Sequence, residues 1–125
     1  MTRPKSRILT ESELRLMNIL WGKGAATVKE VVNALSKDQR LAYTTVLTTL
    51  QTLEKKGFIC HEKQGRAFVY HPVVDRSEAR LSAARYIAGR FFDGSPGLLV
   101  LNILEHEEID FKELQHLKQL LEESE

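Results

Sequence analysis

Residues 42–57, AYTTVLTTLQTLEKKG, and residues 58–72, FICHEKQGRAFVYHP, decide the fold of this chain. In the first stretch, apolar residues recur at helical spacing, which predicts a helix that ends at Gly57. The residues expected to face inward are Val46, Leu50 and Leu53. In the second stretch, apolar and polar residues alternate, which predicts two short strands. Gly65 between the strands supplies the positive φ that a tight hairpin needs.

Two helix starts precede this stretch, and each carries a capping box. Thr10 is followed three residues later by Glu13, and Thr27 is followed by Glu30 at the same distance. The apolar residues at helical spacing are Leu14, Met17, Leu20 and Trp21 in the first helix and Val28, Val31, Val32 and Leu35 in the second. Three helices followed by a β-hairpin is the order of a winged helix-turn-helix, so the sequence predicts such a domain over residues 1–74.

Three further helices are predicted over residues 75–125, with caps at Asp75, Ser95 and Asp110. The segment LLVLNIL, residues 98–104, is apolar almost all round, and a peripheral helix of a small monomer could not bury it. A partner chain could bury this segment, so the sequence predicts a helical dimerisation domain over residues 75–125. Packing of these helices on the winged-helix domain of the same chain, called the head below, is an open alternative. The expected interface residues are Leu81, Phe91, Leu98, Leu101, Leu104, Leu114, Leu117 and Leu121.

Charge is divided unevenly along the 125 residues, although the net charge is only +1. Residues 1–74 carry 12 Lys or Arg against 6 Asp or Glu, whereas residues 75–125 carry 6 against 11. A basic N-terminal part favours contact with a polyanion, and an acidic C-terminal part disfavours it. A chance imbalance between solvated faces is the alternative. No apolar run approaches the ~20 residues that span a bilayer, so we expect a cytoplasmic protein without membrane insertion.

Candidate DNA contacts lie on the third predicted helix and on the hairpin. In a helix-turn-helix, the N-terminal residues of the second helix of the motif meet the base edges in the major groove. Threonine hydroxyls can bond to base edges or phosphates, and a hairpin tip can meet a sugar-phosphate edge. Capping groups and solvated surface are the alternative roles for these side chains. The candidate residues are Arg40, Tyr43, Thr44, Thr45, Thr48, Lys55, Lys63 and Arg66, with Lys56 as an alternative to Lys55 and Arg3, Lys5 and Arg7 as a potential basic arm.

Enzyme chemistry and metal binding find little support in the residues. There is no nucleophile–His–Asp arrangement and no phosphate-binding glycine loop, and Cys60 is the single cysteine. His106 stands in a run of acidic residues that lacks a metal-ligand spacing such as HxxxH, so a solvated charge run is the expected state. We therefore expect neither a catalytic site, nor a metal, nor a cofactor.

The residues quoted above resemble the penicillinase and methicillin-resistance repressors, the BlaI/MecI family. The similarity covers nearly the whole chain, and its most specific pieces are AYTTVLTTLQTLEKKGFI at 42–59 and GRAFVYHP at 65–72. FFDGS at 91–95 is similar to the hinge in the family's tail. The resemblance implies a homodimeric repressor that binds inverted repeats, often with TACA and TGTA cores. The family's copper-responsive branch carries a C-terminal cysteine motif, which this chain lacks.

The resemblance also implies a switch. In the antibiotic-sensing branch, a membrane metalloprotease sensor leads to cleavage in the tail between Asn and Phe, and here Asn102 and Ile103 occupy that position. Family members often carry basic residues where this chain has Leu47 and Thr52. These two departures point to a competing hypothesis, a winged-helix protein-docking module in which DNA binding is weak or lost.

Overall fold

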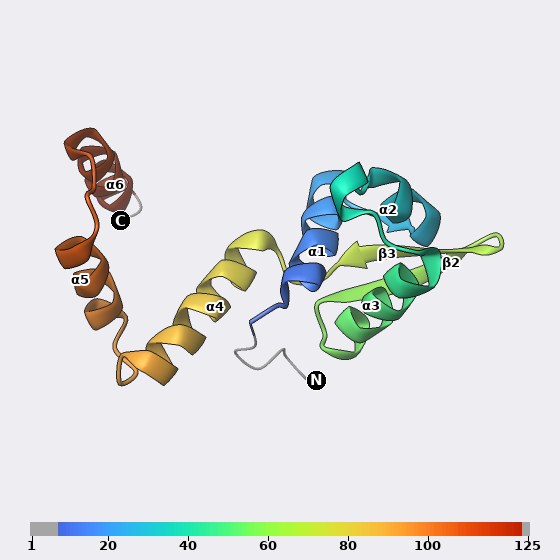
Figure 1. The fold of residues 1–125 in the computed structure, drawn as a ribbon, viewed down its shortest axis with the longest axis horizontal. Coiled ribbons are helices and arrows are strands. Elements are labelled where there is room, and N and C mark those ends of the chain that lie inside the picture. Colours follow the sequence, from blue (N-terminus) through green and yellow to red (C-terminus); the bar gives the residue numbers. More distant parts are fainter. Residues whose placement is uncertain (1–7, 124–125) are drawn as a thin grey trace. The chain divides into compact units, whose positions relative to one another are not determined.

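The computed structural model describes residues 8–123, which form six α-helices, one 3₁₀-helix and a three-stranded sheet (Figure 1). The chain separates into two compact units, Met1–Tyr86 and Ile87–Glu125, and the boundary falls inside a helix. The sequence predicts a division by function, with a DNA-binding domain before residue 75 and a dimerisation domain after it. The division into compact units does not test that prediction. Among the described residues, none of the helices combines the length and apolar character needed to cross a membrane.

The first two helices begin at the predicted capping boxes. Helix α1 (Glu11–Lys23) starts after Thr10, whose hydroxyl accepts from the Glu13 amide at 3.1 Å while the Glu13 carboxylate accepts from the Thr10 amide at 2.9 Å. Helix α2 (Val28–Ala34) starts after Thr27 with the same reciprocal pair to Glu30. Each box satisfies two amides that a helix start leaves without a helical partner. Both predicted starts are therefore confirmed.

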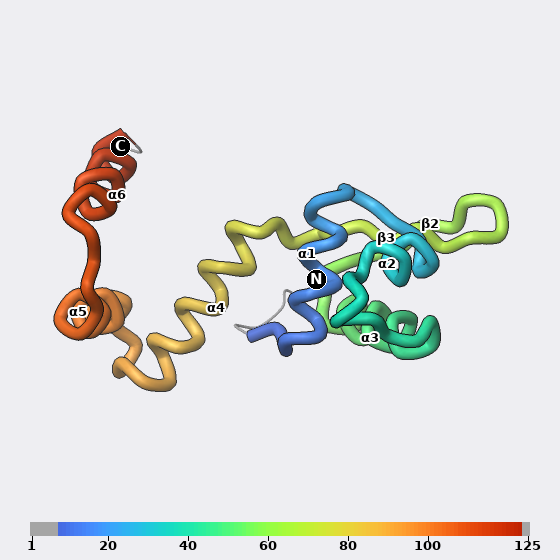
Figure 2. The backbone as a smooth tube through the Cα atoms, turned by 45° about the horizontal axis from the view of Figure 1, so that its top comes forward, coloured from blue at the N-terminus to red at the C-terminus, as the bar shows by residue number. Residues whose placement is uncertain are grey.

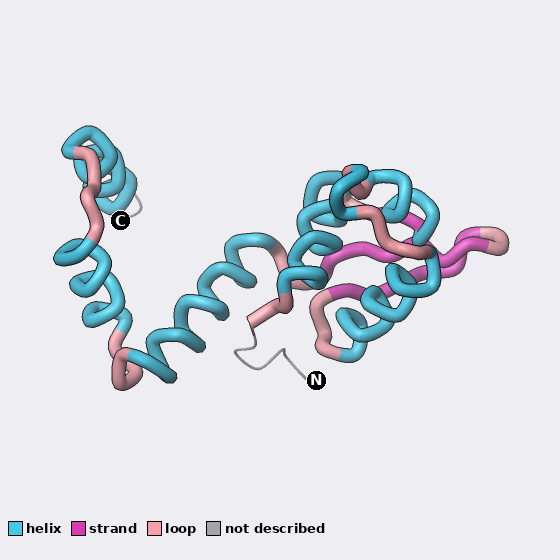
Figure 3. Tube along the Cα trace, viewed as in Figure 1, coloured by secondary structure: helices cyan, strands magenta, loops and turns pink. Residues whose placement is uncertain are grey.

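The stretch at residues 42–57 forms helix α3 (Tyr43–Lys55), which follows the short 3₁₀-helix η1 (Lys37–Gln39). The alternating stretch forms strands β2 (Ile59–Gln64) and β3 (Ala67–Pro72), joined by the two-residue turn Gly65–Arg66. Gly65 has a φ of 61°, as predicted. Figure 3 shows the two strands running out to a short loop at the tip. The turn thereby presents Arg66 at the end of the wing.

The sheet contains a strand that the sequence pattern did not predict. Strand β1 (Ala26–Thr27) pairs with β3, so the strand order is β1-β3-β2. Only Val69 and Tyr70 of β3 have partners in β1, so β1 supports the base of the hairpin, and β2 and β3 alone form its outer end. A two-residue strand has too little sequence to show a period, so only the fold could reveal it.

A single apolar core holds the head together. Helix α3 contributes Val46, Leu50 and Leu53, all fully buried as predicted. The other members of the cluster are Leu16, Met17, Leu20, Ala26, Val28, Val31, Leu35, Phe58, Ile59 and Tyr70. The prediction for α1 was wrong in one place: Leu14 is 43% exposed and Leu16 is fully buried. Each buried leucine contributes roughly 1.5–3 kcal/mol, so the core orients all three helices.

The segment that follows β3 is held to α1 by a tryptophan. Trp21 Nε1 donates to the Val74 carbonyl at 2.9 Å, and the Arg76 guanidinium lies 5.2 Å from the centroid of the Trp21 ring. A cation over an indole face is attracted by the negative charge density of the ring. The chain that leaves β3 is therefore held to the C-terminal part of α1.

The tail contains the three predicted helices, α4 (Arg76–Phe91), α5 (Pro96–His106) and α6 (Phe111–Glu123). Ser95 caps α5 by accepting from the Leu98 amide at 3.1 Å, with proline at the first helical position. All eight residues predicted for a dimer interface are exposed in the single chain, with values from 39% for Leu114 to 78% for Phe91. Asn102 and Ile103 are also exposed and lie within α5.

Candidate nucleic-acid interface

Helix α3 presents an outer face directly opposite the face it buries in the core. Thr44, Thr48, Gln51 and Lys55 follow one another at spacings of four, three and four residues, which places them in one row. All four are exposed. Gln51 was not among the predicted contacts, although its spacing from Thr48 could have identified it. The row therefore offers two hydroxyls, an amide and a cation on one side of a helix.

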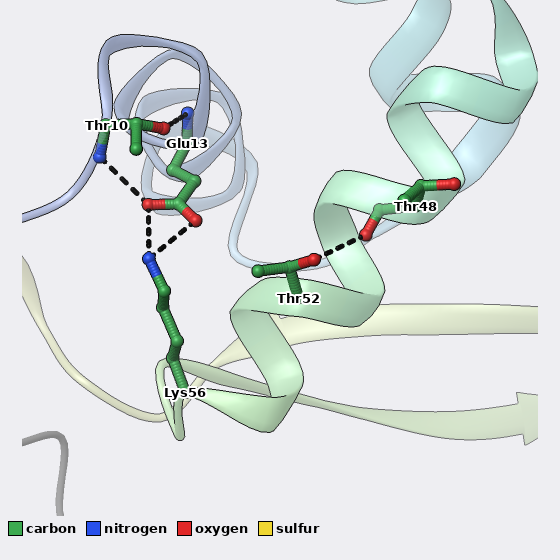
Figure 4. A network of polar contacts seen from close by, with 5 residues as sticks. All are labelled: Thr10, Glu13, Thr48, Thr52 and Lys56. Atoms are coloured by element: carbon green, nitrogen blue, oxygen red, sulfur yellow. Dashed lines mark hydrogen bonds and ion pairs between the residues drawn. The ribbon is translucent and has the colours of Figure 1, made fainter.

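The threonines of α3 divide into two groups by the use of their hydroxyls. Thr49 Oγ1 donates to the Thr45 carbonyl at 2.9 Å. Thr52 Oγ1 donates to the Thr48 carbonyl at 3.0 Å, as Figure 4 shows. Within residues 8–123, the hydroxyls of Thr44, Thr45 and Thr48 have no protein partner. Helical geometry thus occupies two hydroxyls and leaves the three predicted ones available to a ligand.

The two adjacent lysines at the end of α3 have different environments. Lys56 Nζ lies 2.9 and 2.8 Å from the two carboxylate oxygens of Glu13, and its side chain is only 19% exposed (Figure 4). Lys55 is exposed and, in the described portion of the chain, forms no ion pair. The structure thus distinguishes the two lysines that the sequence left as alternatives, since the Lys56 ammonium is already committed to α1.

Glu13 is a buried carboxylate with a complete set of partners. Burial by itself would raise its pKa, but the hydrogen bond from Lys56, the amide of Thr10 and the Lys56 charge together outweigh burial and lower the pKa below its ordinary value of 4.5. Glu13 lies in the first turn of α1 and Lys56 caps α3, so each charge also lies at the helix end that favours its sign. The pair fixes the start of α1 to the end of α3.

The hairpin carries the other predicted cations. Arg66 occupies the turn and Lys63 lies in β2 opposite Phe68, and both cations are exposed. Figure 2 shows the hairpin tip extending beyond the helices of the head. Arg40 is exposed in the segment between η1 and α3, and Tyr43, the first residue of α3, is 53% exposed. The potential arm of Arg3, Lys5 and Arg7 lies outside the described residues.

One edge of α3 faces the hairpin. Burial raises the pKa of Tyr70 in β3, and the nearby Glu54 carboxylate and Tyr43 raise it further. Leu47, on the same edge as Glu54, is half-buried and packs against the head core. The base of the wing and this edge of α3 therefore form one continuous packed surface.

Cys60 lies on the other face of the hairpin, beside His71. Its Sγ is 3.3 Å from His71 Nε2, and His71 Nε2 is 3.2 Å from the Glu62 carboxylate. Burial raises the pKa of the Cys60 thiol, and the carboxylates of Glu54 and Glu62 raise it further. Across residues 8–123, no three His, Cys, Asp or Glu side chains form a group that could hold a metal ion.

Comparison with known proteins gives consistent matches. The family model "Penicillinase repressor" matches residues 9–123. The penicillinase repressor of Bacillus licheniformis is 35% identical over 115 residues, which are 92% of this chain and 90% of that protein. The solution structure of the DNA-binding domain of the repressor BlaI has a TM-score of 0.54 and 34% identity, and the match covers 62% of this chain and 93% of that domain.

A second solved structure shows a relative bound to DNA. It contains the monomeric form of Bacillus licheniformis BlaI in complex with the blaP half-operator, with a TM-score of 0.50 and 36% identity over 59% of this chain and 90% of that one. Fold and similarity together define a winged-helix, DNA-binding transcriptional repressor, a class whose members are not enzymes. The chain belongs to the penicillinase repressor family.

Proposed function

We propose that this chain represses transcription as a homodimer on an inverted-repeat operator, with α3 in the major groove and the wing on the adjacent backbone. The observation that carries the proposal is the outer face of α3, where Thr44 and Thr48 keep free hydroxyls on the side opposite the core. The N-terminal residues of a recognition helix meet the base edges, and phosphate contacts set the register. The DNA-contact roles of Arg40, Tyr43, Thr45, Lys55, Lys63 and Arg66 belong to the same proposal.

Gln51 extends the proposed reading face by one turn. A glutamine amide both donates and accepts, and it can pair with the N6 and N7 atoms of adenine. Its exposure in line with Thr48 supports a role in base preference. Leu47 and Thr52, which pointed to a docking module, have structural roles here, since Leu47 packs on the core and the Thr52 hydroxyl bonds within the helix.

The dimer is proposed on the apolar surface of the tail. Exposure of an apolar surface of this extent to water is unfavourable, and a second chain that covers the surface would remove this free-energy cost. Twofold pairing is the commonest symmetry, and it matches an inverted-repeat site with half-sites about 10 bp apart or a multiple of it. An operator of this kind, with the TACA and TGTA cores that the resemblance implies, is the probe for the experiments below.

Proteolysis is the proposed release from repression. Asn102 and Ile103 are exposed, but their peptide bond lies inside α5, and the Asn102 carbonyl is 2.9 Å from His106 Nδ1. A protease needs an extended strand, so this segment of α5 must unfold locally before a cut. The partner that the resemblance implies is a membrane metalloprotease sensor. Because Ile103 stands where the family has Phe, the protease would have to accept isoleucine after the scissile bond.

We expect Thr44→Ala to reduce discrimination between the operator and altered operators more than it reduces affinity for unrelated DNA. The lost contact is worth ~1–3 kcal/mol when a base edge is involved. Titrations of both kinds of duplex, followed by fluorescence anisotropy, measure the ratio. Thr49→Ala is the matched control, because the Thr49 hydroxyl already bonds to the Thr45 carbonyl. A parallel fall in specific and unrelated binding would leave Thr44 as a group that positions the protein without reading bases.

We expect Arg66→Ala to weaken binding about equally across DNA sequences, because a wing guanidinium on the backbone contacts a phosphate. The slope of log K against log salt should fall by roughly one unit. Arg15→Ala is the control, since the Arg15 guanidinium is paired with Glu11 at 3.3 Å on α1. An unaltered slope in Arg66→Ala, with circular dichroism unchanged, would remove Arg66 from the contacts.

A further inference from the structure

A hydrogen bond joins α3, the proposed reading helix, to the wing, which is the hairpin of β2 and β3. Glu54 lies in the last turn of α3 and His61 lies in β2. The Nδ1 atom of His61 is 2.8 and 2.9 Å from the two carboxylate oxygens of Glu54. Within the described residues this is the one side-chain hydrogen bond that links α3 with the hairpin. The contact therefore connects the two elements to which the proposed function assigns DNA contacts.

The imidazole is held on its other side by aromatic rings. The His61 ring centroid lies 4.8 Å from that of Phe68 and 5.4 Å from that of Tyr70, both in β3. Tyr70 is 2% exposed and belongs to the core. The side chain is thus placed between a carboxylate on α3 and two rings on the wing, which restricts its rotamer.

The position of His61 along the hairpin lets the contact influence the direction of the hairpin tip. His61 pairs with Tyr70, which is also where β1 supports β3. Beyond Val69 the hairpin has only two strands, from Lys63 through the Arg66 turn to Phe68. A two-stranded hairpin alone is marginally stable, so the direction of its tip depends on how its base is held. His61 and Glu54 hold that base against the reading helix.

Glu54 is otherwise an unfavourable residue at this place. A carboxylate on a helix that approaches DNA is repelled by phosphates and weakens binding. Its side chain is only 32% exposed, so water and salt screen the repulsion incompletely. A structural use for the carboxylate would account for its presence on α3.

We propose that His61 and Glu54 are positioning residues, which fix the wing at the angle to α3 that lets Arg66 and the reading helix contact one half-site together. The inference rests on the proposed function and goes beyond it, because neither side chain needs to touch DNA. It makes the phosphate contact of Arg66 depend on a hydrogen bond in the part of the hairpin that β1 supports, away from the turn.

A double-mutant cycle on the full chain tests this dependence. Operator affinity is measured for the wild type, Glu54→Ala, Arg66→Ala and the double variant at one salt concentration. We expect the penalty of Arg66→Ala to be about fivefold smaller in the Glu54→Ala background, a coupling within the range for residues that act as a unit. His61→Ala, which breaks the same contact from the wing side, should reduce the penalty similarly.

Two controls separate positioning from charge. Glu54→Gln removes the same charge as Glu54→Ala but keeps an oxygen that can accept from His61 Nδ1, so the penalty of Arg66→Ala should stay near its wild-type value. Glu62→Ala removes the other histidine-paired carboxylate of this region, which bridges to His71 within the hairpin. It should leave the Arg66→Ala penalty unchanged. Thermal melting curves verify that every variant is folded at the assay temperature.

The outcomes distinguish this inference from the function on which it rests. If the wild type prefers the operator but the cycle with Glu54→Ala is additive, or Glu54→Gln behaves like Glu54→Ala, positioning by His61 is refuted and the repressor function stands. If the wild type shows no preference for the operator over unrelated DNA, the proposed function fails first, and the inference fails with it.

Discussion

Removal of residues 103–125 is expected to leave the protein monomeric, because it removes much of the surface of the proposed dimer, and to weaken operator binding by about 10²–10⁴-fold. The shortened chain loses the whole of α6 and the last turn of α5, including the exposed apolar residues Phe111, Leu114, Leu117, Leu120 and Leu121. Each head would then bind its half-site alone, without the effective concentration that a linked second head provides. Repression would lapse although α3 is unchanged.

The measurement is the mass of residues 1–102 in solution, followed by titration of the operator. Leu117→Glu in the full chain is a milder variant that places a charge in the apolar row of α6, and it should weaken the dimer in the same direction. Gln115→Glu is its control, because Gln115 lies on the opposite side of that helix. A shortened chain that stayed dimeric and bound at full affinity would disprove both the interface and the proteolytic switch.

Lys56→Met is expected to lower the free energy of unfolding by about 3 kcal/mol. It leaves the Glu13 carboxylate, whose side chain is 6% exposed, without its cation while the core around it stays closed. Lys55→Met is the matched control: the neighbouring lysine is exposed, so stability should hardly change while the salt slope of DNA binding falls by roughly one unit. The two variants should thus separate stability from DNA contact. Equal loss of stability in both would contradict the assignment of Lys56 to the ion pair.

The same pair predicts a pH dependence. Because the folded-state pKa of Glu13 is below its ordinary value of 4.5, its contribution to stability is present above that value and is lost as the pH falls through the folded pKa. Urea denaturation of the wild type should show this loss on acidification. In Lys56→Met the burial of Glu13 favours the protonated carboxyl, so the loss should shrink or reverse sign. A profile identical to that of the wild type would mean that Lys56 does not set the Glu13 pKa.

The sequence by itself determined the elements whose causes are local. Both capping boxes, at Thr10 and Thr27, and the Ser95 cap act over three residues, so they could be identified without any tertiary contact. The inward face of α3 followed from its period, and the glycine turn of the wing followed from the positive φ that Gly65 adopts. The winged-helix class depends only on the order of these elements, which is why the fold could be predicted. The repressor class followed from the resemblance of these stretches to the BlaI/MecI family.

Tertiary structure decided everything that depends on which side chains meet when the helices and strands pack together. Lys55 and Lys56 are equivalent in sequence, and only the packing of α1 against α3, 43 residues apart at the ion pair, commits Lys56 to Glu13. The choice of Leu16 over Leu14 for the core depends on the same packing, since both fit a helical period. Strand β1 and the bond between His61 and Glu54 exist because the folded chain brings their partners together. Burial and pairing are properties of the assembled head, and no local pattern specifies them.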